Sequence, residues 1–165
     1  MGLEWTTQNI HHYAQVGPWE LHVMAWDGKG RWDVTYTEGG AVVVATGHCQ
    51  DANEVRAAAI AGLHEWLCEQ YRMARARVVG WRPVGSMGGR KAYCGAFRLE
   101  VTWDGFWNVW LDGEDDLGCI ATGPAEPDAK AARAAMLKVW RMWLRGQVLA
   151  VEGLTDDTPG CKVSP

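Results

Sequence analysis

The sequence predicts an α+β fold made by tandem duplication. Two copies of a strand–strand–strand–helix unit form an antiparallel sheet that carries both helices on one face. Two observations predict this fold. Short motifs recur in the same order, 75 to 77 residues apart, along the 165-residue chain. Within each copy the apolar residues first alternate with polar ones and then recur every three or four positions, the order expected of strands followed by an amphipathic helix.

The duplication rests on five motif pairs whose order is preserved. The clearest is Trp26-Asp27-Gly28, which recurs as Trp103-Asp104-Gly105. The other pairs are 32–34 with 107–109, 45–47 with 121–123, 56–58 with 133–135, and 66–67 with 143–144. Because the offsets differ by no more than two residues, only small insertions separate the copies, and chance is a poor explanation of the pattern.

The strands are clearest in the second copy. Phe97, Leu99 and Val101 alternate with polar residues, which is the period of a strand buried on one face. Asp104-Gly105 is a hairpin signal, and the apolar alternation resumes after it. The segment Gly118-Cys119-Ile120-Ala121 predicts a short third strand, which Gly123-Pro124 ends.

A helix follows the strands in each copy, predicted over residues 51–73 and 127–145. The second helix begins near Pro127-Asp128, since proline is tolerated in the first helical turn and an acidic side chain suits the positive end of the helix dipole. Its apolar stripe consists of residues three and four positions apart, namely Ala132, Ala135, Met136, Val139, Trp140, Trp143 and Leu144.

These elements divide the chain into five segments. We predict an N-terminal extension (1–16), a first repeat (17–76), a basic linker (77–93), a second repeat (94–146) and a C-terminal tail (147–165). A single unit of about 55 residues is marginal alone, so the two copies are expected to share a core. They could do so in one six-stranded sheet, which we favour, or in two sheets packed together.

This plan resembles the YegP-like family of small bacterial proteins, which are tandem repeats of three strands and a helix with a Gly-Ile-Ala type of third strand. The resemblance covers roughly residues 19–70 and 95–146, and residues 118–121 match the third-strand motif loosely. It implies the duplicated architecture. It implies no activity, because none is established for the family.

Positive charge is concentrated in the middle of a chain whose net charge is −4. Residues 71–93 contain six basic and no acidic side chains, whereas the flanking segments are acidic. Such a segment could bind phosphates, stack on bases, fit an acidic protein surface, or complement the acidic repeats of its own chain. The candidate partner-binding residues in and beside it are Arg72, Arg75, Arg77, Trp81, Arg82, Arg90 and Lys91.

Tryptophan is unusually abundant, with 11 residues. Those that repeat between the copies (Trp26, Trp32, Trp103, Trp107) are predicted to build the fold, whereas Trp5, Trp19, Trp81 and Trp110 show no repeat partner. Phe106 and Trp110 alternate away from Trp107 and Val109, and the matching face of the first copy reads Arg31, Asp33, Thr35. This asymmetry predicts that Phe106 and Trp110 bind a partner on the open side of the sheet, unless the termini cover it.

Catalytic and metal-binding chemistry is poorly supported. His64 and Cys68, four apart on the first helix, provide fewer ligands than a closed metal site needs and are predicted to be surface residues. His48 and Cys49 are adjacent in a strand and therefore point to opposite faces, away from each other. The sequence predicts no catalytic residue, no metal site and no cofactor.

We therefore expect a non-enzymatic protein-binding module that acts as a small regulator or inhibitor, encoded by a phage against host defence in the manner of an anti-CRISPR protein. The alternative is a nucleic-acid-binding protein that uses the basic segment 72–91. The scattered cysteines suggest free thiols. Because the N-terminus lacks signal-peptide character and no long apolar run is present, a bacterial or host-cell cytoplasmic location without membrane contact is expected.

Overall fold

The computed structural model describes residues 3–38, 40–76, 78–85, 88–112 and 117–154, and its fold is α+β. The first half contains β1 (Thr6–Gln8), β2 (His11–Val16), β3 (Trp19–Trp26), β4 (Lys29–Tyr36), β5 (Val42–Cys49) and α1 (Val55–Arg75). The second half contains β6 (Arg82–Val84), β7 (Gly89–Cys94), β8 (Phe97–Val101), β9 (Trp107–Asp112), β10 (Leu117–Gly123) and α2 (Ala129–Glu152).

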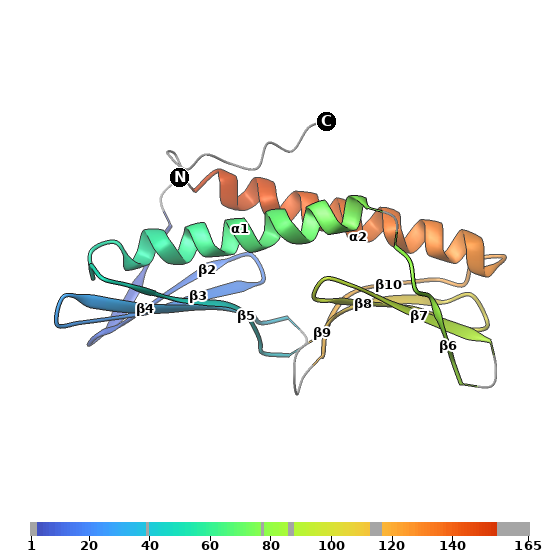
Figure 1. Ribbon diagram of the computed structural model, residues 1–165, viewed down its shortest axis with the longest axis horizontal. Helices are drawn as coiled ribbons and strands as arrows, with labels where there is room; N and C mark the ends of the chain where they lie inside the picture. The colour runs from blue at the N-terminus through green and yellow to red at the C-terminus, as the bar shows by residue number, and fades with distance from the viewer. Residues whose placement is uncertain (1–2, 39, 77, 86–87, 113–116, 155–165) are drawn as a thin grey trace.

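The strands form two antiparallel sheets, each a five-stranded meander in chain order, and both helices lie on the same side of them (Figure 1). The prediction of one continuous six-stranded sheet was therefore wrong. Each half has two additional strands before the predicted three, where the sequence indicated an N-terminal extension and a basic linker. These strands are only three or six residues long, and β1 and β2 are mostly polar whereas β6 and β7 contain arginine and lysine, so they lack the apolar alternation that would reveal them.

The helices were placed correctly, and both extend beyond their predicted ends. α2 begins where Asp128 caps it: the Asp128 carboxylate accepts hydrogen bonds from the amides of Lys130 (2.7 Å) and Ala131 (2.8 Å). These bonds lower the pKa of Asp128. α2 continues through Val148 and Val151, both buried, into the segment predicted to be a tail.

Each helix lies over the sheet of its own repeat and also reaches the sheet of the other. Gln147 of α2 accepts a hydrogen bond from the Trp19 indole in β3, at 2.9 Å. Gln70 of α1 accepts one from the amide of Ala96, which precedes β8, at 3.0 Å. The two halves are therefore interlocked rather than stacked as independent units.

An aromatic cluster fills the junction between the sheets and the helices. Trp19 and Phe97, which occupy equivalent positions in β3 and β8, are fully buried. The ring of Trp19 lies 5.4 Å from Trp66 of α1, and that of Phe97 lies 5.3 Å from Trp140 of α2. Edge-to-face and tilted pairs of this kind stabilise a core beyond their buried area. Both repeats thus contribute to one hydrophobic core.

The structure corrects the assignment of several tryptophans. Trp26 and Trp103 were predicted to build the fold, yet 39% and 63% of their surfaces are exposed, because Trp26 ends β3 at a hairpin turn and Trp103 lies in the turn after β8. Trp5 and Trp81 do have a repeat relationship: the guanidinium of Arg56 lies 5.3 Å from the Trp5 ring, and another arginine lies 5.5 Å from the Trp81 ring. The second arginine is Arg133, at the matching position of α2.

His64 and Cys68 are not the surface residues that the sequence suggested. His64 is 4% exposed and Cys68 is 9% exposed. The His64 Nε2 lies 3.6 Å from the Cys68 Sγ and 3.7 Å from the Glu152 Oε1 near the end of α2. The covering helix belongs to the other repeat, which explains why the periodicity of α1 alone did not predict this burial.

Candidate binding face on the second sheet

The open side of the second sheet is the face directed away from the helices. Alternation along β8 and β9 turns Leu99 and Val109 toward the helices, where both are fully buried. The residues between them face outward, and cross-strand partners share a face. The outward residues that carry aromatic or cationic groups are Arg82, Lys91, Tyr93, Arg98, Phe106 and Trp110, which we call the aromatic–cationic face.

Three of these residues form a row across adjacent strands. Tyr93 of β7 pairs with Arg98 of β8, which pairs with Trp110 of β9. Since neighbouring strands are about 4.8 Å apart, the backbones of Tyr93 and Trp110 are about 10 Å from each other, one on each side of Arg98. The Arg98 guanidinium lies 5.7 Å from the centre of the Trp110 ring, and the Lys91 ammonium lies 5.9 Å from that of Tyr93. Both are cation–π distances.

Hydrogen bonding on this face is incomplete. The Arg98 Nε lies 3.2 Å from the Glu100 Oε1, which makes an ion pair, but neither this N–H nor the Trp110 indole N–H has a hydrogen-bond partner among the described residues. Buried donors of this kind are costly until they meet an acceptor. A partner that supplied acceptors after a small side-chain movement would relieve that cost.

Exposed apolar side chains lie in and around the row. Tyr93 is 53% exposed and Phe106 is 47% exposed. At the end of the sheet, Val84 and Trp103 are exposed as well and line a hollow of about 120 Å³ together with Gly89. Because Gly89 has no side chain, the hollow remains open between its neighbours. Its volume is comparable to that of one aliphatic side chain.

The open side of the first sheet instead carries stacked histidine and tyrosine rings beside an aspartate. His22 lies between His11 and Asp33. The His22 Nε2 is 2.9 Å from the His11 Nδ1, and the His22 Nδ1 is 3.2 Å from the Asp33 Oδ2. Tyr13 stacks on His22 with ring centres 4.7 Å apart. These side chains bond to one another and leave fewer groups for a partner. The Tyr93–Arg98–Trp110 row is specific to the second repeat, because the equivalent residues of the first repeat are Gln15, Glu20 and Thr35.

The structure separates the predicted site residues into two sets. Arg82, Lys91, Phe106 and Trp110 lie together on the open face. The remaining ones lie elsewhere. Arg72 and Arg75 lie in the last turns of α1, and Trp81 lies against Arg133 of α2. Arg90 is the cross-strand partner of Val101 and shares its inward face. Arg77 lies outside the described residues.

Trp110 is less accessible than the sequence indicated. It is half-buried, because the Arg98 guanidinium covers its ring and strands lie on both sides of β9. Tyr93, Arg98 and Trp103 were missed as site residues. Tyr93 was hidden in the segment interpreted as a linker, and Trp103 was assigned to the core because it repeats. The polar position of Arg98 in the alternating strand 97–101 was the available signal.

The fold and this face together define a duplicated α+β protein with one aromatic–cationic sheet surface. The chain matches no protein-family model, and neither a curated protein nor a solved structure matches it significantly. Within the described part of the chain, none of the helices combines the length and the apolar character that crossing a membrane requires.

Proposed function

We propose that this chain is a protein-binding module that uses the aromatic–cationic face of its second sheet. The observation that carries the proposal is the clustering of the exposed Tyr93 and Phe106 side chains around the Arg98–Trp110 pair on this face. Tyr93 and Phe106 occupy positions equivalent to Gln15 and Arg31 of the first repeat. A feature that only one copy has cannot serve a folding requirement common to both, so a binding role accounts for it better.

A protein partner fits this face better than a nucleic acid does. The hollow beside Val84 and Trp103 suits a single side chain of a partner, and exposed aromatic residues with arginine are typical of protein hot spots. Non-specific affinity for phosphates depends on dense positive charge. Here the net charge is −4, and Glu100 already neutralises Arg98. A chain with one such surface would act as a regulator or inhibitor by covering its partner.

A second candidate, binding of single-stranded nucleic acid, is favoured by one feature. The cations over Tyr93 and Trp110 match the arrangement in which bases stack on aromatic rings beside a charged backbone. This candidate makes a distinct prediction, namely that binding weakens steeply with salt because counterions are released.

The test compares matched variants of the full chain. Tyr93→Ala combined with Phe106→Ala removes exposed apolar surface, whereas Arg72→Glu changes an exposed residue of α1. Each of the three proteins is used to capture partners from an extract of the native host. A protein captured by wild type and by Arg72→Glu, but not by the double variant, is purified and titrated with all three. Loss of about 2 kcal/mol or more in binding is expected for the double variant.

A titration with oligothymidylate separates the two candidates. Failure of oligothymidylate to bind supports the protein partner. Binding that the double variant abolishes and that salt weakens assigns the face to nucleic acid. Equal capture of the same proteins by wild type and double variant contradicts the protein-binding use of this face, and oligothymidylate binding that the double variant retains contradicts the nucleic-acid use.

A further inference from the structure

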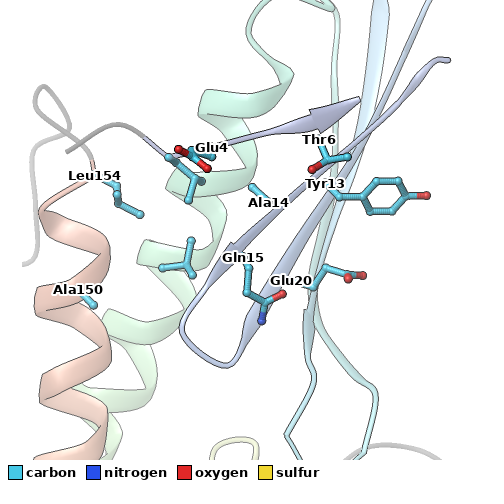
Figure 2. A pocket seen from close by; sticks show the side chains of 10 residues that line it. Glu4, Thr6, Tyr13, Ala14, Gln15, Glu20, Ala150 and Leu154 are labelled. Carbon is cyan, nitrogen blue, oxygen red and sulfur yellow. The ribbon is translucent and has the colours of Figure 1, made fainter. Parts of the chain in front are cut away.

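A separate groove lies in the first repeat, along the outer edge of its sheet (Figure 2). It has a volume of about 670 Å³ and forms where the segment before β1 departs from β2. It is lined by Leu3 and Glu4 before β1, by the end of β2, and by Leu154 after α2 on the helix side.

The end of β2 is an open strand edge within this groove. β1 pairs with β2 only from His11 to Tyr13, so on that side no described strand pairs with the last three residues of β2. A two-residue hairpin joins β1 to β2, and because of it His11 and Tyr13 direct their backbone N–H and C=O groups toward β1. By alternation, the N–H and C=O of Gln15 point to the same side and face the groove.

The two sides of this edge differ in chemistry. Ala14 and Val16 turn toward the helices, and with Leu3 and Leu154 they form an apolar floor. Gln15 turns toward the open face of the sheet, opposite Glu20. Both charged side chains among the described residues that line the groove, Glu4 and Glu20, are acidic.

We propose that this groove binds an extended peptide segment of a partner in which apolar and basic residues alternate, and that the segment adds a short strand to β2. Its backbone would bond to Gln15, its apolar side chains would lie opposite Ala14 and Val16, and its basic side chain would lie beside Glu20. Main-chain bonds supply affinity in this mode of recognition, and the side-chain alternation supplies specificity. The site is independent of the aromatic–cationic face and goes beyond the function proposed for it.

The probe is a fluorescein-labelled pentapeptide in which valine alternates with lysine, titrated into the full chain and followed by anisotropy. Two comparison peptides replace each lysine by glutamate or the central residue by proline, which cannot donate to a ladder. Both are expected to bind at least about tenfold more weakly than the lysine peptide.

Protein variants test the same contacts from the other side. Glu4→Gln and Glu20→Gln should each weaken binding about threefold, as for exposed ion pairs. Gln15→Pro removes the backbone N–H that faces the groove. Gln15→Ala keeps that N–H and serves as the matched control, because each variant loses the side-chain hydrogen bond to the Gly17 carbonyl. Gln15→Pro should abolish binding and Gln15→Ala should retain it. The Tyr93→Ala and Phe106→Ala changes should leave peptide binding unaltered.

Amide hydrogen exchange locates the peptide directly, and protection of Gln15 on binding is expected. Equal affinity for the lysine and glutamate peptides would overturn the proposal, as would equal binding by the Gln15→Pro and Gln15→Ala proteins. Loss of peptide binding in the Tyr93→Ala and Phe106→Ala variants would move the peptide to the other face, and so contradict this inference while leaving the proposed function standing.

Discussion

The indole of Trp19 donates a hydrogen bond to the side-chain oxygen of Gln147 at 2.9 Å, although 128 positions separate the two residues. The contact joins the second helix to the first sheet. Its counterpart joins the first helix to the second sheet, where Gln70 accepts from the amide of Ala96 at 3.0 Å. The duplicated glutamines therefore hold the two repeats together reciprocally, each at the hairpin that precedes a central strand.

We expect Gln147→Leu to lower the free energy of unfolding by about 1–2 kcal/mol, because the buried indole N–H of Trp19 loses its acceptor. Urea denaturation measures the change. Arg145→Leu introduces the same side chain at an exposed position of α2 and should alter stability little. Equal unfolding midpoints for the two variants would show that the hydrogen bond contributes nothing.

The interlocked helices also predict that a half-chain cannot fold alone as a monomer. Residues 1–79 lack α2, so Trp19 and the rest of the first sheet lose part of their cover. Circular dichroism during thermal unfolding should show no cooperative transition for this fragment, and mixing it with residues 80–165 should restore one. A monomeric half-chain that unfolds cooperatively would mean that the repeats are independent.

Two helical glycines should respond to alanine in opposite directions. A Cβ at Gly62 of α1 would collide with the ring of Trp32, whereas a Cβ at Gly146 of α2 would meet nothing within 4 Å. Gly62→Ala is therefore expected to destabilise the protein by about 1–3 kcal/mol through overpacking. Gly146→Ala should stabilise it by about 0.5–1 kcal/mol, since alanine is the better helix former. Thermal denaturation of both variants tests the sign of each change, and stabilisation by Gly62→Ala would contradict the packing of Trp32.

Tyr36 should titrate at an unusually high pH. Burial, with the nearby Glu38 carboxylate, raises the pKa of Tyr36 to about 12 from its usual value of 10.0. Since the folded state holds this proton more tightly than the unfolded state, the stability that Tyr36 contributes is complete below pH 10 and is lost as the pH rises toward 12. Absorbance at 295 nm should show a late phase that Tyr36→Phe removes. A titration curve that Tyr36→Phe leaves unchanged above about pH 11 would refute this burial.

The sequence was a good guide wherever the signal is local. Alternation in residues 97–101 and the 3–4 spacing of Met136, Trp140 and Leu144 depend only on the geometry of one strand or one helix, and all of these residues are buried as predicted. The strands β6 and β7 carry no such pattern, because each is short and partly open to solvent. They were therefore interpreted as a linker, and the sequence did not predict that Tyr93 lies on the open face of the sheet.

By itself the sequence determined the duplication, the α+β class, the helices and four of the six residues of the aromatic–cationic face, because repeated motifs and periodicities are local properties of the chain. The tertiary structure alone decided that there are two sheets, that each helix reaches the opposite repeat, and that Arg98 lies between Tyr93 and Trp110. Strand pairing and helix exchange depend on which distant surfaces fit together. That fit is a property of packed side chains from both repeats, so no window of either repeat alone contains it.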